Sequence, residues 1–336
     1  MALPSSGQIT LNQVNVELGL SGTAQISMND SAVRTLFDVA SGEIEMSDGY
    51  GKANEFTFTI SSSTQEANLA TLATSAGWNG NAPLICNINS GVYVWSDDLS
   101  DAGLLINGSY PNGLIVNNSG LVMGKGGASG VGYSAADKAG QPGGDAIEIS
   151  TSSTVTINNN SGAYIGGGGG GGSPFSAGGG AGGGAGGARG EYNHAYGGQG
   201  GTIGNSGQNG NDPYGQGRPV AIGGGAGGGG GGVDNGGYVR RGAGGGRVFP
   251  GSGGGGGAGN VGNGGAGGSA GNNGSNGGYH GYYGGGGGGG GGWGANGGSG
   301  SLLPPAILAG GSGGKAIEDN GSSYTLSNSG TIYGAT

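Results

Sequence analysis

Nine consecutive glycines, Gly284 to Gly292, place the strongest constraint on what this chain can fold into. Glycine loses more conformational freedom on folding than any other residue, so such a run is ordered only if a regular arrangement holds it. Similar runs recur between Gly166 and Gly300, and 99 of the 336 residues are glycine. This composition excludes an ordinary globular domain. The glycine-rich block is therefore either a flexible linker or a regular structure built from glycine.

Aromatic residues argue against the linker. Glycine and serine linkers seldom carry aromatic side chains, because they have no core to fill and no surface to bind. Collagen is excluded too, since glycine does not keep a strict three-residue period and proline is scarce. The aromatic residues that interrupt the block are Phe175, Tyr192, Tyr196, Tyr214, Tyr238, Phe249, Tyr279, Tyr282, Tyr283 and Trp293.

Charge and cysteine content exclude several classes of protein. The net charge is -9, and a chain without a basic stripe is a poor candidate for binding nucleic acid. The single cysteine, Cys86, cannot form an internal disulfide, and in the stretch "PLICNI" we interpret it as a small buried apolar residue. No run of eighteen apolar residues and no signal segment after Met1 is present, so we expect synthesis in the cytoplasm without export by that route.

A short repeat occupies the first 52 residues. The frame [QE]-I-x-[LM]-[NS]-[QD] begins at Gln8, Gln25 and Glu43. Its alternating apolar residues predict a short strand in each copy, followed in the first two copies by a short helix. The fifth residue of the frame is Asn12, Asn29 or Ser47, and Asn and Ser are typical helix N-cap residues. We therefore predict a small α+β docking module at residues 1–53, too small to be stable alone.

A second repeat predicts a stack of β-strands. "VNNSGLVMG", "INNNSGAYIG" and "LSNSGTIYG" begin at Val116, Ile157 and Leu326, and each places an Asn-Ser-Gly corner between two apolar runs. Such units are typical of stacked β-rungs. In addition, "GGDAIEIS" from Gly143 returns as "GGKAIEDN" from Gly313, offset by 170 residues. We therefore predict a β-helix-like stem at residues 54–165, an inserted glycine-rich domain at 166–312, and a returning rung at 313–336.

The backbone conformations open to glycine indicate which regular structure the inserted domain can form. Glycine runs form an extended left-handed helix with three residues per turn, about 3.1 Å of rise per residue and no internal hydrogen bonds. The backbone groups must then bond to neighbouring chains, and the absence of Cβ atoms lets those chains approach closely. The fold class we predict is thus mostly β and irregular, with packed polyglycine II helices in the insertion.

Segments between the glycine runs have a recognition-like composition. Loops rich in Tyr, Gly, Asn and Arg on a rigid scaffold are typical of binding surfaces. We expect some aromatic residues, Phe175 and Trp293 among them, to form a small core at the ends of the runs. The predicted binding residues are Tyr192, His194, Tyr196, Tyr214, Arg218, Tyr238, Arg240, Arg241, Phe249, Tyr279, His280, Tyr282 and Tyr283.

These features resemble the glycine-rich distal tail-fibre adhesins of T-even-like bacteriophages over roughly residues 80–336, including "NNSGLVMGKGG" and "GGKAI". The resemblance implies a sandwich of polyglycine II helices in a virion protein, at a tail or tail-fibre tip. Its loops would bind an outer-membrane protein or lipopolysaccharide of the host. The first 52 residues resemble instead the repeat modules of other phage tail proteins, which implies docking on other tail or fibre components. A single capping copy and a homotrimeric tip both remain open.

Catalytic and metal chemistry find little support in the sequence. "GLVMGKGG" lacks the spacing and the Ser or Thr of a phosphate loop, and His194 and His280 have no companion ligands, so we predict no metal and no cofactor. We also expect no enzymatic activity. One alternative is a polysaccharide-degrading tail spike that uses Asp97, Asp98 and Asp101. The other is an ice-binding polyglycine protein, which the bulky aromatic and arginine residues disfavour.

Overall fold

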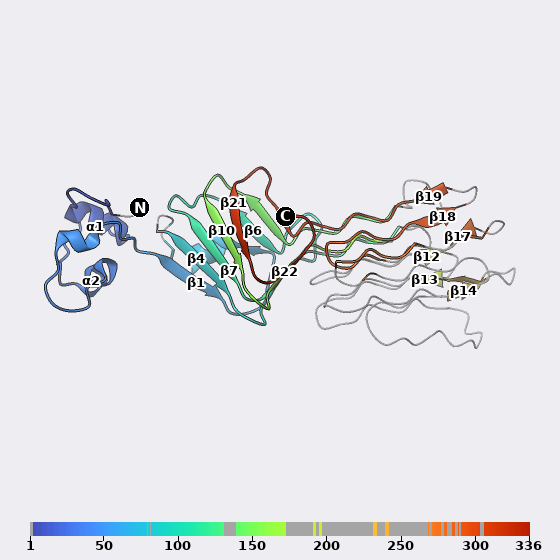
Figure 1. Ribbon diagram of the computed structural model, residues 1–336, viewed down its shortest axis with the longest axis horizontal. Helices are drawn as coiled ribbons and strands as arrows, with labels where there is room; N and C mark the ends of the chain where they lie inside the picture. Colours follow the sequence, from blue (N-terminus) through green and yellow to red (C-terminus); the bar gives the residue numbers. More distant parts are fainter. Residues whose placement is uncertain are drawn as a thin grey trace.

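The computed structural model describes residues 3–78, 80, 82–130, 139–172, 191–192, 195–196, 231–233, 239–241, 268, 271–276, 279–280, 284–285, 288, 290–302 and 306–336. The molecule is elongated, with helices at one end, β-sheets in the middle and extended segments leading to the other end (Figure 1). The described residues are mostly β, with three α-helices and parallel sheets in the middle part. The prediction of a mostly β fold is confirmed.

The N-terminal module is helical. Helix α1 spans Leu11–Glu17, α2 spans Ser31–Phe37, and a 3-10 turn, η1, spans Met46–Gly49. These are the two helices that the sequence predicts after the first two copies of the repeat. A separate small core holds the module together; its buried members are Leu3, Ile9, Val14, Val33, Leu36 and Phe37.

The predicted strands of this module are wrong, because residues 3–53 contain no strand. The repeat frame is instead a turn that starts each helix. The backbone N–H of its third residue donates to the side chain of its sixth residue at 2.8 Å in every copy. The pairs are Thr10 with Gln13, Ser27 with Asp30, and Glu45 with Asp48. Side chains reaching back three residues favour helix initiation over an extended strand.

The N-cap assignments shift for the same reason. The N-caps are Thr10, Asp30 and Glu45, not Asn12, Asn29 and Ser47. Asn12 lies inside α1, where its amide donates to the carbonyl of Gly22 at 3.1 Å. The module is therefore α rather than α+β.

Three parallel sheets form the stem. The first joins β1 (Phe56–Ile60), β4 (Leu84–Ile88), β7 (Leu114–Asn118), β10 (Val155–Asn159) and β21 (Tyr324–Asn328). The second joins β2 (Thr64–Gln65), β5 (Tyr93–Trp95), β8 (Leu121–Met123), β11 (Tyr164–Gly166) and β22 (Thr331–Tyr333). The third joins β3 (Ala67–Asn68), β6 (Leu104–Asn107), β9 (Ile147–Ser150) and β20 (Ile317–Glu318), with helix α3 (Leu69–Ser75) following β3.

The stem core comes largely from alternation along strands β4, β6, β7, β9 and β10. In β4, Leu84, Cys86 and Ile88 are at most 1% exposed, while Ile85 and Asn87 are only partly buried. The same inward positions of β10 hold Val155 and Ile157, both fully buried. Period-two alternation of this kind places one face of each strand in a shared core. The interpretation of Cys86 as a buried apolar residue is confirmed.

Asparagine ladders join the rungs at the Asn-Ser-Gly corners. Asn158 donates to Asn117 at 2.8 Å and Asn117 to Asn87 at 2.9 Å, on the outer side. On the inner side the buried Asn159 accepts from Asn118 and donates to Asn328. The register aligns the three predicted corner units with one another, so their predicted stacking is confirmed. Identical amides in register satisfy one another and fix that register.

The connection between the second and the third sheet becomes longer from each rung to the next. The connection from the second to the third sheet is residue 66 in the first rung, 96–103 in the second, 124–146 in the third and 167–316 in the fourth. The last of these returns in the predicted register, because Ile317 pairs with Ile147 at the 170-residue offset. The glycine-rich segments are therefore long excursions from a single corner of the stem.

Candidate functional site

A bundle of extended segments carries the candidate site. Its described segments are 124–130, 140–145, 166–172, 290–293, 294–299 and 309–315, and they cross back and forth beyond the stem (Figure 1). The segment Gly166–Gly172 lies among the others. All its residues are glycine, so every group available for bonding belongs to the backbone.

Backbone bonding repeats every third residue along Gly166–Gly172. Its first, fourth and seventh carbonyls accept N–H bonds of 2.8–3.0 Å from segment 124–130. Its second and fifth carbonyls accept from Gly294 and Gly291, at 2.7 and 2.8 Å. Its third and sixth residues donate to segment 140–145 and accept from segment 309–315, at 2.8–2.9 Å. Each of its three faces is thus bonded to different neighbours, as a helix with three residues per turn allows.

Close approach explains why these positions must be glycine. A Cβ atom built at Gly168 would fall on the carbonyl oxygen of Lys125, and one at Gly170 on that of Gly311. A Cβ at Gly288, in the nine-glycine run, would fall on the carbonyl oxygen of Gly298. Backbone atoms cannot rotate away as a flexible side chain can. Gly288 is therefore enclosed by the backbone of a neighbouring segment.

On exposed faces of the bundle, asparagine side-chain oxygens accept hydrogen bonds from backbone N–H groups, in place of backbone carbonyls. Asn273 and Asn276, three residues apart, accept from the backbone N–H groups of Asn296 and Ser299 at 3.0 and 2.9 Å. The side chain of Asn296 in turn accepts from Gly313 at 2.9 Å. The three-residue period thus extends to side chains, which tie adjacent segments together on exposed faces.

Trp293 fixes the bundle against the stem. It is fully buried beside Leu121 and Met123, and its ring meets that of Tyr333 edge-on with centroids 6.1 Å apart. The partly buried aromatic residues packed around this cluster are Tyr93, Trp95, Tyr164 and Tyr333. The expectation that Trp293 belongs to a core is confirmed, whereas Phe175 lies outside the described residues. A large aromatic contact of this kind orients the bundle relative to the second sheet.

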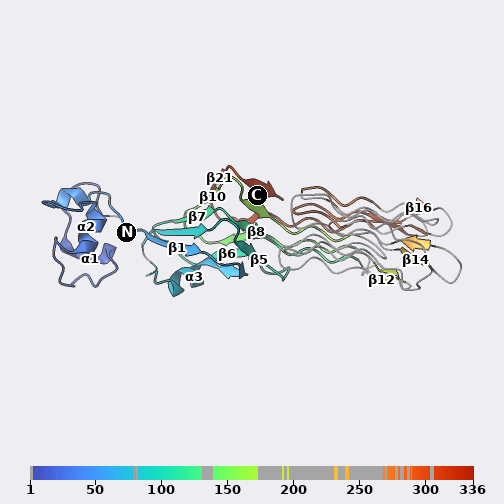
Figure 2. The same cartoon turned by 90° about the horizontal axis from the view of Figure 1, so that it is seen from below.

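Among the described residues, four antiparallel hairpins lie at the end of the molecule opposite α1 and α2 (Figures 1 and 2). We call these eight strands the tip hairpins. β13 contacts β14 and β17 contacts β18, so neighbouring hairpins adjoin one another. The pairs are β12 (Glu191–Tyr192) with β13 (Ala195–Tyr196), β14 (Gly231–Val233) with β15 (Val239–Arg241), β16 (Tyr279–His280) with β17 (Gly284–Gly285), and β18 (Gly300–Leu302) with β19 (Ala306–Leu308).

Six predicted binding residues lie on the tip hairpins: Tyr192, Tyr196, Arg240, Arg241, Tyr279 and His280. On two hairpins the residue directly across the ladder is glycine. Arg240 pairs with Gly232, and Tyr279 with Gly285. A glycine partner provides no cross-strand side chain against which a ring or guanidinium could pack. The remaining predicted residues, His194, Tyr214, Arg218, Tyr238, Phe249, Tyr282 and Tyr283, lie outside the described residues.

One hairpin at this end escaped the sequence analysis. Ile307 on β19 is 78% exposed, and it faces Ser301 across the ladder. The sequence "SLLPPAILA" carries a detectable signal, because it is an apolar stretch interrupted by two prolines. A search directed at aromatic, arginine and histidine residues passes over it.

Comparison with known protein families assigns this architecture. Residues 55–234, more than half of the chain, match the family described as phage tail fibre adhesin Gp38. The chain belongs to this family. No curated protein matches it. Among solved structures, the gp37-gp38 adhesin tip complex of the bacteriophage S16 long tail fibre is similar, with 21% identity over 91% of each chain and a TM-score of 0.42.

The family match confirms the resemblance drawn from the sequence, and it begins at residue 55 rather than near residue 80. Residues 3–53 of the adhesin lie outside the matched range, in agreement with the different resemblance of that module. Because the TM-score of the similar structure is low, the assignment rests on the family match. None of the described helices is long and apolar enough to cross a membrane.

The acidic residues considered for an enzyme are held in a turn of the adhesin stem. Hydrogen bonds from the backbone N–H and hydroxyl of Ser100 lower the pKa of Asp98. Asp97 accepts from the amide of Gln65 at 2.6 Å. A general acid needs a raised pKa, and Asp98 shows the reverse. Within the described ranges no cluster of three His, Cys, Asp or Glu residues is arranged to hold a metal ion.

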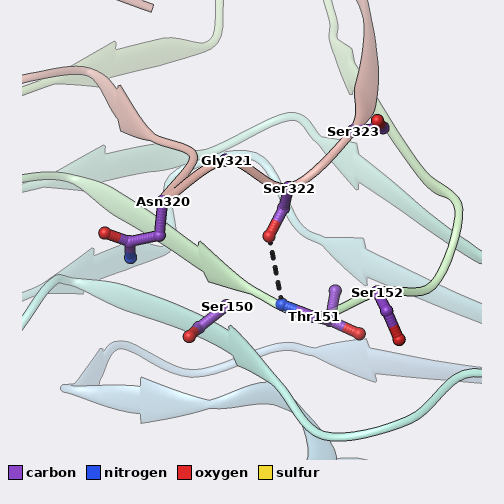
Figure 3. Close-up of a pocket in the computed structure, with 7 residues that line it drawn as sticks. All are labelled: Ser150, Thr151, Ser152, Asn320, Gly321, Ser322 and Ser323. Carbon is purple, nitrogen blue, oxygen red and sulfur yellow. Dashed lines mark hydrogen bonds between the residues drawn. The ribbon is translucent and has the colours of Figure 1, made fainter.

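A separate polar pocket of about 430 Å³ lies between two stem corners (Figure 3). Its lining is Ser150, Thr151, Ser152, Asn320, Gly321, Ser322 and Ser323. The hydroxyl of Thr151 donates to the carbonyl of Gly108 at 2.7 Å, and that of Ser322 accepts from the Thr151 backbone at 3.2 Å. These hydroxyls join successive rungs, and the lining carries no charged group. We assign the pocket to the structure of the stem.

Proposed function

We propose that this adhesin forms the receptor-binding tip of a tail fibre and recognises an outer-membrane protein or lipopolysaccharide of the host through its tip hairpins. The observation that carries the proposal is the gathering of four hairpins at the end remote from the helical module (Figures 1 and 2). Three of them carry the tyrosine, arginine and histidine residues expected from the sequence. Rings and guanidinium groups on a rigid base dominate the energy of many interfaces.

The bundle supplies the rigid base in this proposal. Backbone bonds repeat every third residue along Gly166–Gly172, and close backbone neighbours leave no room for Cβ atoms there. Both observations support polyglycine II helices in segments 124–130, 140–145, 166–172, 290–299 and 309–315. The parallel pairing of successive corners supports a β-helix-like stem. A scaffold with few accessible conformations lowers the entropy lost when its loops bind.

The helical module is the attachment end in this proposal. It has its own core, it lies outside the matched family range, and it sits opposite the tip hairpins (Figure 1). We propose that residues 3–53 dock on another tail or fibre protein, either as one copy or as part of a homotrimer. We also propose that the adhesin acts without catalysis; the lowered pKa of Asp98 makes that carboxyl unsuited to the general-acid role that a polysaccharide-degrading site needs.

The test is competition for host cells. Purified wild-type protein should occupy the receptor and block adsorption of the phage. The double change Tyr279→Ala with His280→Ala on β16 should abolish blocking and leave the melting temperature unchanged. Thr57→Ala with Thr59→Ala on the exposed outer side of β1 is the control, and it should block like the wild type.

Two results would contradict the proposal. If wild-type protein saturates the cells without blocking phage adsorption, the proposal that this protein recognises the receptor is contradicted. A double variant that melts much lower but still blocks would assign those residues to the fold.

A further inference from the structure

We infer that the open edge of strand β21 pairs with the same edge of a second copy of this chain, so that the adhesin forms a two-fold, side-by-side dimer. The inference goes beyond the proposed function, because it concerns the contact between copies of the adhesin and not the receptor. Each copy keeps its own helical module, so the dimer fits docking of residues 3–53 as single copies rather than as a homotrimer.

The apolar core of the stem is uncovered at its last rung. Leu326 and Ile332 continue the inward columns of Ile157 and Ile165, with which they pair in register. Ile157 and Ile165 are fully buried, whereas Leu326 and Ile332 are only partly buried. At the other end of the stack, Phe58 on β1 is 8% exposed. The last rung of a stack needs a polar outer surface or a covering partner, and this rung presents apolar side chains.

The hydrogen-bond ladder of the first sheet also ends at β21. Among the described residues, β10 pairs with one side of β21 and no strand pairs with the other. In preceding rungs the N–H groups of inward residues donate to the next rung: Leu84 to the carbonyl of Gly113 at 3.1 Å, and Leu114 to that of Thr154 at 3.0 Å. The inward residue Leu326 therefore directs its N–H and carbonyl to the open side.

The usual protection of an edge strand is absent from this rung. Proteins shield such edges with charged side chains or proline, and residues 320–336 contain no charged residue and no proline. The chain as a whole has a net charge of -9. Two acidic copies can therefore approach through this uncharged edge with little local repulsion.

The sequence of β21 is complementary to itself, which selects a second copy as the occupant. Antiparallel pairing centred on Leu326 places that leucine opposite the same leucine of the other copy, on the core side. Thr325 then faces Ser327, and their hydroxyls meet on the outer side. Such a two-fold contact closes on itself, because the open edge of each copy covers that of the other.

The position of the edge leaves both ends of each copy accessible. Figures 1 and 2 place β21 on a flank of the molecule, between the helical module and the bundle. The bundle leaves the stem at the corner between the second and third sheets, opposite the first sheet. A two-fold axis perpendicular to the first sheet exchanges the other two sheets and keeps this corner on the same side. Both sets of tip hairpins can then face one cell surface, which raises avidity.

Disulfide trapping tests the pairing, because the only cysteine of the chain, Cys86, is buried. Leu326→Cys places two thiols across the axis at a hydrogen-bonded pair, where Cα atoms lie about 5.5 Å apart and a disulfide can form. Thr325→Cys is the matched control on the same strand, because its two copies lie diagonally across the pair at about 7–8 Å. Leu326→Lys places two like charges at the axis. Melting temperatures and the mass in solution are measured for each protein.

We expect wild-type protein at micromolar concentration to sediment at twice the monomer mass of 31.4 kDa. Oxidation should trap Leu326→Cys as a covalent dimer and leave Thr325→Cys untrapped, and Leu326→Lys should sediment as a monomer. Wild-type protein of monomer mass, or of three times that mass, would overturn the inference. A wild-type dimer that both cysteine variants trap equally, or that neither traps, would also overturn it. Receptor recognition is tested separately by competition for host cells, so these outcomes leave the proposed function intact.

Discussion

Single glycines set the limits of the bundle, because the Cβ of almost any other residue would collide with backbone. At Gly170 and Gly288 the added atom would meet the carbonyls of Gly311 and Gly298. We expect Gly170→Ala and Gly288→Ala each to destabilise the bundle by about 3 kcal/mol or more, the upper range for overpacked sites. Gly144→Ala is the matched control in the same bundle, because the nearest atoms to its Cβ would lie 3.4 Å away, at ordinary van der Waals contact, and its backbone is not in the left-handed region. Thermal unfolding measures both, and equal losses would argue against close packing.

The reactivity of the single residue Cys86 reports whether the stem core is closed to solvent. Burial raises the pKa of its thiol to about 12, so at pH 8 roughly one molecule in ten thousand carries the reactive thiolate. The native protein should react with a thiol reagent only after unfolding. Because labelling proceeds through the unfolded chain, the rate should rise tenfold per pH unit only up to the ordinary thiol pKa of about 8.5 and then level off, as long as the fold persists. Rapid labelling of the native protein at pH 8 would show that the inner face of β4 is open to solvent.

At the scale of elements, the asparagine ladders hold the rungs in register. The buried Asn159 accepts from Asn118 and donates to Asn328, whereas the partly buried Asn158 belongs to the outer ladder. Asn159→Ala should lower the free energy of unfolding by about 3 kcal/mol, because it leaves the buried amide of Asn118 with fewer partners. Asn158→Ala should cost about 1 kcal/mol or less. Chemical denaturation measures the difference, and similar values for the two variants would contradict a special role for the inner ladder.

The elements also show how far sequence reasoning reaches. Local repeats gave the stacked corners and the returning rung, since each copy contains both its strand and its turn. The N-terminal strands were wrong because alternating Ile and Met also fit a turn in which Gln13, Asp30 or Asp48 bonds three residues back. The tip hairpins were not predicted as strands, because their pairing depends on where long excursions end. Ile307 was missed because a lone apolar residue has no local signature of exposure.

At the scale of the whole molecule, the proposed function places attachment and recognition at opposite ends of the long axis. The helical module lies at one end, the tip hairpins at the other, and the cross-bonded bundle joins them through the stem (Figures 1 and 2). Because the two ends have no shared core among the described residues, each can vary without disturbing the other. This arrangement accounts for a family match that begins at residue 55 and leaves the N-terminal module outside it.

Amide hydrogen exchange of the intact protein, with and without vesicles of host outer membrane, tests this separation most directly. Amides that become buried or bonded at an interface exchange more slowly. We predict slower exchange in residues 191–196, 231–241, 279–285 and 300–308 when the vesicles are present, and unchanged exchange in residues 3–53. Slower exchange confined to residues 3–53 or to the stem strands, with the tip hairpins unaffected, would contradict the account.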